Sequence, residues 1–247
     1  MKISVQMSLS AENEIILDIN YQGKFLSLIK RGLSQTNPDL FNELYNKNSA
    51  KSFTTSMYFP EATFTKDKII LAKEVKNNAI MNFSCEDSVL GLSFYNAFMH
   101  LHNQGRIKLN SQLSVYVSNL VLHKEFSIVS EEIIVKTLSP IAVRNQQSKF
   151  LSLSKENINE FNSALRENTK AKIKIIHPEL LSLVDDLEMI PITTKKVIVK
   201  HFDINVEATI GKFILKGNSL LLNVLYRTGL GVKTGGFLGM ISLIKEV

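Results

Sequence analysis

The sequence predicts an α+β protein that consists of two tandem domains with the same order of secondary structure. Three observations lead to this class: some short runs alternate apolar and polar residues, other runs repeat apolar residues at helical spacing, and the same order of runs occurs twice. That order, strand-helix-strand-strand-helix-strand, is the ferredoxin-like pattern, which is also that of RRM-like domains. We therefore expect one ferredoxin-like domain over residues 1–125 and a second over residues 126–247, joined near residues 123–131.

In the first domain, Ile3 and Val5 alternate with polar residues, which predicts a strand that pairs with the next apolar run, residues 15–19. A short helix is expected to begin at Pro38, because proline suits the first helical turn and Asn37 can cap it. The other predicted elements are, in order, a helix over 21–33, the short helix over 38–45, strands over 53–59, 68–72 and 79–84, a helix over 87–103 and a strand over 113–122.

In the second domain, Phe161 and Leu165 lie at helical spacing, and Ser154 is a suitable cap for the helix that carries them. The predicted elements are, in order, a strand over 133–137, a helix over 155–168, strands over 172–176, 197–202 and 204–215, a helix over 219–226 and a strand over 237–244.

Composition excludes several classes of protein. A hydrophobic fraction of 45% over 247 residues is that of a folded chain and excludes disorder as the main state. The single cysteine, Cys85, excludes an internal disulfide and a cysteine-rich zinc site. No run approaches the ~18 apolar residues of a membrane span, and residues 1–6 alternate in polarity, unlike a secretory signal. We therefore expect a cytoplasmic protein without membrane attachment.

Basic residues exceed acidic ones by 29 to 23, and the excess is unevenly placed in the second domain. Residues 133–174 and 195–247 are rich in lysine and arginine, whereas residues 175–194 contain four acidic residues and no basic one. Two basic stretches therefore flank an acidic insert. This distribution favours an anionic partner, with nucleic acid ahead of other anions.

A glycine-rich loop, residues 229–239, holds five of the eleven glycines of the chain. It follows a predicted helix and precedes a strand, whereas nucleotide-binding loops follow a strand and open a helix, so nucleotide binding is disfavoured. Two interpretations stay open. The loop could be structural, its glycines serving positive φ angles and close packing, or Lys233 and the free backbone N–H groups could hold an RNA backbone.

The linked set of motifs resembles a known family. Two ferredoxin-like halves, the last helix, the pattern G-h-G-x-K-x-x-x-x-x-G and a final strand are similar to the CRISPR-associated repeat endoribonucleases, the sixth Cas family of the RAMP superfamily. Further similar stretches are residues 37–45, the lysine segment (residues 51–56), the Ser-Pro segment (Thr137-Leu-Ser-Pro-Ile-Ala-Val143) and Lys216-Gly217-Asn218.

The resemblance implies an RNase of antiviral defence that binds CRISPR repeat RNA and cuts the precursor crRNA once within each repeat. Cleavage in the family proceeds without a metal ion or other cofactor. The ribose 2′-hydroxyl attacks the adjacent phosphate and leaves a 2′,3′-cyclic phosphate and a 5′-hydroxyl. Other Cas proteins are implied as possible partners, and the chain could act as a monomer or a homodimer.

The resemblance also assigns catalytic positions. Tyr45 occupies the slot that is often a histidine in the family, Lys51 matches the family lysine, and Lys30 matches a tyrosine of some members. Neither a tyrosine nor a lysine is a base at pH 7 unless its pKa is lowered. Three interpretations stay open: a slow enzyme that orients the 2′-hydroxyl and stabilises charge, a catalytically silent repeat-RNA binder, and a Tyr45 that only covers its helix end.

The remaining candidates are RNA contacts. They are basic residues beside the family-like motifs together with residues of the glycine-rich loop: Arg31, Lys136, Arg144, Lys149, Arg227, Gly229, Gly231, Lys233 and Thr234. A second set of lysines is expected on solvated faces: Lys170, Lys172, Lys174, Lys195 and Lys196. The five histidines are read as surface or capping residues, of which only His123 and His201 could approach a cleft between the domains. A generic ligand-binding ferredoxin-like protein is the third functional alternative.

Overall fold

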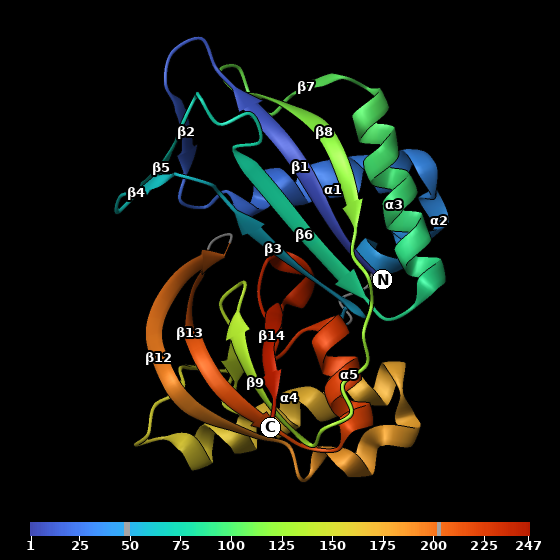
Figure 1. Cartoon of the computed structure of the whole chain (residues 1–247), viewed down its shortest axis with the longest axis vertical. Coiled ribbons are helices and arrows are strands. Elements are labelled where there is room, and N and C mark those ends of the chain that lie inside the picture. The colour runs from blue at the N-terminus through green and yellow to red at the C-terminus, as the bar shows by residue number, and fades with distance from the viewer. Residues whose placement is uncertain (47–49, 202–203) are drawn as a thin grey trace. The chain divides into compact units, whose positions relative to one another are not determined.

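The computed structural model describes residues 1–46, 50–201 and 204–247, which form two units. Unit 1 comprises residues 1–49 and 57–124, and unit 2 comprises residues 50–56 and 125–247. The lysine segment therefore clusters with the second unit. Each unit is shown in Figure 1, unit 1 in blue to green and most of unit 2 in yellow to red.

Strand β1 (Lys2–Ser10) is the centre of the main sheet of unit 1, whose order is β3-β6-β1-β8-β7. It pairs antiparallel with β6 and with β8. The alternation expected from the sequence is present, since Ile3, Val5 and Met7 are buried and their neighbours are half-buried. The other bounds in this sheet are β3 (Phe53–Tyr58), β6 (Ala79–Cys85), β7 (Arg106–Lys108) and β8 (Ser114–Leu122).

The pairing expected between β1 and residues 15–19 is wrong. Both edges of β1 are occupied, so β2 (Ile15–Asp18) joins a separate small sheet instead, in the order β2-β5-β4. The partners in that sheet are β5 (Lys68–Leu71) and β4 (Thr63–Phe64).

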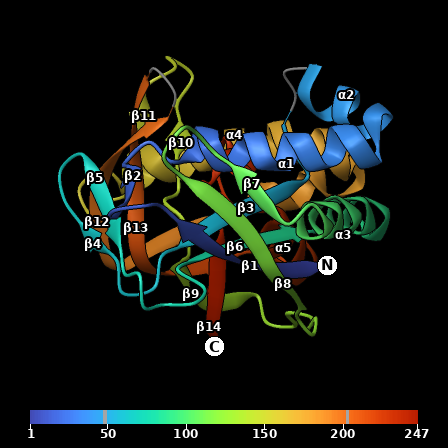
Figure 2. The same ribbon diagram turned by 90° about the horizontal axis from the view of Figure 1, so that it is seen from above.

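Helices α1 (Gln22–Thr36) and α3 (Ser88–Asn103) pack side by side (Figure 2). Their close approach depends on Gly32, because a Cβ there would lie 2.8 Å from the carbonyl oxygen of Ala97. The short helix α2 (Pro38–Asn46) begins where the sequence predicts, and the side chain of Asn37 accepts from the Leu40 N–H at 3.1 Å.

Strand β9 (Glu132–Thr137) has the same central position in unit 2, whose sheet runs β12-β13-β9-β14. Its neighbours are β13 and β14, and helices α4 and α5 contribute Phe161 and Leu225 to the core. The bounds are β10 (Val143–Arg144), β11 (Phe150–Leu151), α4 (Ile158–Ile176), the 3-10 helix η1 (Pro178–Val184), β12 (Glu188–His201), β13 (Ile204–Lys216), α5 (Ser219–Thr228), the 3-10 helix η2 (Thr234–Gly236) and β14 (Ile241–Glu246).

In both units the first strand of the pattern lies between the third and the fourth, so the two sheets have the same strand order. The predicted class, two ferredoxin-like domains, is confirmed. In the described part of the chain, no helix is both long enough and apolar enough to cross a membrane.

Four predicted elements of unit 2 are wrong in type or extent. The strand predicted over 197–202 begins at Glu188, as β12. Residues 172–176 are the last turns of α4 rather than a strand, because the buried face of that helix continues through Thr169 and Ile173. The helix begins after Asn157 and not after Ser154. The last strand begins at Ile241, and Phe202, expected in a strand, lies outside the described residues.

Candidate functional site

Three of the family-like segments in unit 2, namely the glycine-rich loop, the Ser-Pro segment and the lysine segment, are joined by hydrogen bonds. The glycine-rich loop is fastened to the Ser-Pro segment through the Val232 N–H, which donates to Ala142 at 2.9 Å, and the Gly239 N–H, which donates to Pro140 at 2.8 Å. Just after the loop, the Met240 N–H donates to the Ser139 hydroxyl oxygen at 2.9 Å. Segments about ninety residues apart in sequence therefore form one structure.

The lysine segment completes this arrangement. The hydroxyl of Thr54 donates to the Leu238 carbonyl oxygen at 3.1 Å, and the Phe237 N–H donates to the Thr55 hydroxyl oxygen at 3.0 Å. The Ser139 hydroxyl donates to the carbonyl oxygen of Thr55 at 3.2 Å. All of these groups are buried, so each bond satisfies a polar atom that would otherwise be costly to bury.

Most backbone N–H groups whose bonds are described in the glycine-rich loop donate to oxygens of the protein itself. Gly231 has a φ of 72°, and a Cβ there would lie 2.1 Å from the carbonyl oxygen of Ala142. Six of the N–H groups donate to protein oxygens, those of Gly229, Leu230, Val232, Gly236, Phe237 and Gly239. The idea that these amides are free to hold RNA phosphates is therefore wrong for these six, since a buried loop must satisfy its own polar groups.

The cations at the loop are side chains. Lys233 is exposed and has a left-handed backbone, with a φ of 61°. Partial burial, with the neighbouring charge of Arg144 in second place, lowers the pKa of Lys233. In the described chain, no acidic group forms an ion pair with either side chain. The backbone of Arg144 is fixed by Asn168, which accepts from its N–H at 2.8 Å and donates to its carbonyl oxygen at 2.7 Å.

Lys51 lies against the same loop. A Cβ built on Gly235 would be 3.0 Å from Cγ of Lys51 and 3.0 Å from the ring of Phe53, so a larger residue there would press on both side chains. The structure thus brings together Lys51, Arg144 and Lys233, three residues that the sequence singles out for different reasons.

One residue beside the loop, His201, is not among the site residues that the sequence predicts. His201 ends β12 and is only 5% exposed, and its ring occupies the space beside Gly236. Burial lowers the pKa of His201 to about 4, with the charge of Lys233 adding to the effect. A lone histidine at a strand end carries no signal of this neighbourhood, because the loop it touches is more than thirty residues away.

Tyr45 and Lys30 meet in unit 1. The ammonium of Lys30, on α1, lies 4.8 Å from the centroid of the Tyr45 ring, on α2. Phe41, one turn earlier on α2, packs against the Tyr45 ring, and the centroids of the two rings are 5.5 Å apart. Burial raises the pKa of Tyr45 well above its usual value of 10.0. The phenol is therefore protonated at pH 7 and cannot act as a base.

The other predicted RNA contacts differ in their surroundings. Lys136 is exposed on β9 and stands directly opposite Lys212 of β13, a like-charged pair that an anion would relieve. Arg227 lies 4.0 Å from the carboxylate of Glu125. Lys149 and Arg31 are exposed, whereas Thr234 of the loop is buried.

Lys172 does not lie on a solvated face as predicted. It is buried, and its ammonium donates to the carbonyl oxygens of Gly229 at 2.7 Å and Thr228 at 3.4 Å. These carbonyls end α5 and open the glycine-rich loop. Burial lowers the pKa of Lys172 to about 7. The residue therefore ties α4 to the start of the loop, a role consistent with a cation at a helix C-terminus.

The other four histidines have local structural partners. Within the described ranges, no three His, Cys, Asp or Glu side chains gather as metal ligands would. The pairs are His100 with Gln104, His102 with the Val117 carbonyl oxygen, His123 with the Ser4 hydroxyl and His177 with Glu179.

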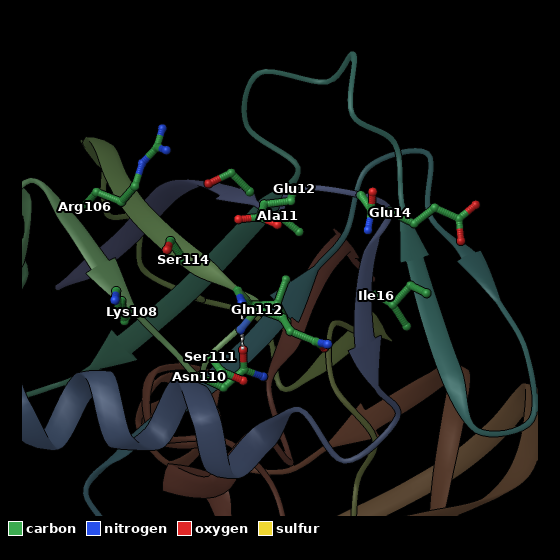
Figure 3. Close-up of a pocket in the computed structure, with 13 residues that line it drawn as sticks. Ala11, Glu12, Glu14, Ile16, Arg106, Lys108, Asn110, Ser111, Gln112 and Ser114 are labelled. Atoms are coloured by element: carbon green, nitrogen blue, oxygen red, sulfur yellow. Dashed lines mark hydrogen bonds between the residues drawn. The ribbon is translucent and has the colours of Figure 1, made fainter.

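A cavity of about 660 Å³ lies in unit 1, away from these motifs in sequence (Figure 3). Arg106 and Lys108 of β7 line it together with Glu12 and Glu14 from the turn after β1. Among the described residues that line the cavity, none belongs to the family-like segments. Its mixed charges give no preference for an anion.

Comparison with known proteins agrees with the motifs. Residues 123–243 match the family model described as CRISPR associated protein Cas6, C-terminal. The fold is similar to that of a protein from a Cas6-related gene of Pyrococcus furiosus, with a TM-score of 0.82 and 18% identity over 100% of this chain and 99% of that chain.

Two further solved structures share the fold. One is described as a RAMP protein binding different RNA substrates, with a TM-score of 0.80 and 21% identity over 99% of this chain and 100% of that one. The other is a Cas6 product complex, with a TM-score of 0.68 and 15% identity over 98% and 99%. No curated protein matches the chain in sequence. With the family match, these likenesses confirm the resemblance that the sequence motifs carry.

Proposed function

Because residues 123–243 of this chain belong to the C-terminal domain family of CRISPR associated protein Cas6, we propose that the protein binds CRISPR repeat RNA and cuts precursor crRNA within each repeat. The observation that carries this proposal is the joining of the lysine segment, the Ser-Pro segment and the glycine-rich loop in unit 2. This junction presents Lys51, Arg144 and Lys233 around one loop, as a phosphate backbone needs.

The reaction in this proposal is a transesterification. The ribose 2′-oxygen attacks the adjacent phosphorus, and the 5′-oxygen leaves, so the products carry a 2′,3′-cyclic phosphate and a 5′-hydroxyl. Negative charge builds on the phosphate oxygens in the transition state, and a fixed cation such as Lys51 stabilises it. Lys51 is suited to this role because the buried hydroxyls of Thr54 and Thr55 hold its segment to the loop.

A second candidate function is RNA binding without cleavage. It is favoured by Tyr45, whose raised pKa removes it as a base in the slot where the family often has histidine. In that case the protein would keep repeat RNA within a larger Cas assembly.

Cleavage in the presence of EDTA separates these two functions. We expect repeat RNA incubated with excess protein and EDTA to be cut once per repeat, leaving a 2′,3′-cyclic phosphate end that acid opens and a 5′-hydroxyl end that a kinase labels. A shift of the RNA in a gel without any product at enzyme excess would leave binding as the function. Absence of both a shift and a product would contradict both proposals.

Reversing the charge of Lys233 tests whether the loop contacts RNA. We expect Lys233→Glu to weaken repeat-RNA binding about tenfold and to lower the slope of log affinity against log salt by about 0.7–1, because one phosphate contact is lost. The measurement is a titration of labelled, uncleavable repeat RNA at several salt concentrations.

Lys174→Glu is the matched control, since Lys174 is an exposed lysine of α4 in the same unit. It changes the net charge equally and should leave the salt slope almost unchanged. Equal effects of the two variants would mean that only overall charge matters and that the loop is structural.

A further inference from the structure

Helix α3 has an outer face without charged residues. Residues 88–105, which include the whole helix, contain no Asp, Glu, Lys or Arg. The helix nevertheless lies on the outside of unit 1, beside α1 (Figure 2), and its side chains Val89 and Leu92 are 75% and 54% exposed. A surface helix normally presents charged residues to solvent, as α1 does with Arg31 and α2 with Glu43. The outer face of α3 therefore has the composition of a contact surface.

The outward residues of α3 repeat at the spacing by which two helices pack along their length. They follow one another at intervals of three and four residues, as the apolar positions of a coiled coil do. We call this stripe the α3 seam, and it consists of Val89, Leu92, Asn96, Met99 and Asn103. All are exposed except Met99, which is half-buried. The buried core positions of the helix, such as Phe94 and Phe98, form a separate set.

The α3 seam is symmetric about Asn96. Val89 lies seven residues before Asn96 and Asn103 lies seven residues after it, while Leu92 and Met99 lie four and three residues away on its two sides. Two antiparallel copies of the helix therefore place Val89 against Asn103, Leu92 against Met99, and the two Asn96 amides against each other. An amide can both donate and accept a hydrogen bond, so the central pair satisfies itself and fixes the register.

The charges that flank the helix also complement a second copy. Asp87 comes directly before the helix and Arg106 three residues after it, and both are exposed. They lie nine and ten residues from Asn96, so antiparallel copies bring Asp87 of each beside Arg106 of the other. Within the described part of the chain, Arg106 forms no ion pair. A parallel pair would instead bring like charges together, so the charges favour the antiparallel order.

We propose that α3 is the contact surface of a homodimer, in which the α3 seams of two copies pack antiparallel about a two-fold axis at Asn96. The inference is independent of the proposed function, because it needs neither RNA nor cleavage. A helix of 16 residues is about 24 Å long, so the interface belongs to the small class. We therefore expect a weak dimer, with a dissociation constant on the order of 10 μM.

Sedimentation velocity of the whole protein without RNA tests the dimer. From about tenfold below to about tenfold above that constant, the mass should rise from that of one chain toward that of two. Leu92→Glu should weaken association about tenfold or more, because it buries a carboxylate in the seam. Leu220→Glu is the matched control, since Leu220 is a 61% exposed leucine of α5 in unit 2, and it should associate like the natural protein.

Cysteine cross-linking tests the antiparallel order. In the proposed dimer the two copies of position 96 face each other within reach of a disulfide, whereas the two copies of position 103 are about 21 Å apart along the helix. Under mild oxidation Asn96→Cys should give a disulfide-linked dimer and Asn103→Cys should not. The natural protein gives the background, because its single cysteine, Cys85, is buried.

Three results would overturn the proposal. A natural protein that stays a single chain at the highest concentration would exclude the dimer and leave the face to a different protein. Association that Leu92→Glu leaves unchanged, or that Leu220→Glu weakens equally, would place the contact elsewhere. Equal cross-linking at positions 96 and 103 would exclude the antiparallel order. Thermal unfolding identifies a Leu92→Glu protein that is misfolded, and Val89→Glu, at another exposed position of the seam, then takes its place.

Discussion

Lys51→Ala is expected to slow single-turnover cleavage of repeat RNA by about 10²–10³-fold, the usual cost of removing one fixed group that stabilises transition-state charge. The side chain of Lys51 lies against Gly235, and buried bonds from Thr54 and Thr55 anchor its segment to the glycine-rich loop. These bonds fix the lysine segment beside the loop, where the proposal places the phosphate. The measurement is the rate of product formation at enzyme excess in EDTA.

Tyr45→Phe is the contrasting variant. The raised pKa of the phenol removes it from proton transfer at pH 7, so the variant should cut within about threefold of the natural rate. A large loss with Tyr45→Phe and none with Lys51→Ala would place the chemistry on the phenol and would contradict the role proposed for Lys51. Lys174→Ala controls for the loss of one positive charge.

Lys172→Met is expected to change how stability depends on pH. The folded-state pKa of Lys172 is about 7 against 10.5 for an ordinary lysine, so between these values the unfolded chain holds a proton that the folded chain lacks. The free energy of unfolding therefore rises with pH across this window, by on the order of 3–5 kcal/mol in full. Methionine fills a similar volume and does not titrate, so the contribution vanishes in the variant.

The quantity to measure is the difference in free energy of unfolding between the natural protein and Lys172→Met, from urea titrations at several pH values between 6 and 10. Taking the difference cancels the titration of groups common to both proteins. Lys174→Met, on an exposed position of the same helix, should show a difference that does not vary with pH. A difference that is flat for Lys172→Met as well would mean that the buried ammonium stays charged in the folded protein.

The errors in the predicted elements have a common physical cause. The β-branched run at residues 172–176 favours a strand locally, yet Ile173 continues the buried stripe of Phe161 and Leu165, and tertiary packing extends α4 through it. Pairing of β1 with residues 15–19 is the nearest option along the chain, but strands far away in sequence occupy both edges of β1. The periodicity of apolar residues indicates where a helix or strand lies, but it does not indicate which other element packs or pairs with it.

The same limit applies to the candidate site. Lys233 and Lys51 could be predicted as site residues because they lie inside motifs. Lys172 was predicted on a solvated face because a lysine in a polar stretch usually faces solvent. Only the backbone carbonyls at the end of α5, brought next to α4 by packing, make its burial possible. His201 lacks any motif, and its contact with Gly236 is one that no local pattern encodes.

The sequence by itself determined the two-domain α+β class, the element order, and the family-like motifs, because periodicity, caps and glycine spacing are properties of neighbouring residues. Tertiary structure alone decided which strands pair, that the three motifs meet, that the loop amides donate within the protein, and that an imidazole lies against Gly236 of the loop. These features depend on contacts between residues far apart in the chain and on the burial that shifts the pKa values of Tyr45, Lys172 and His201.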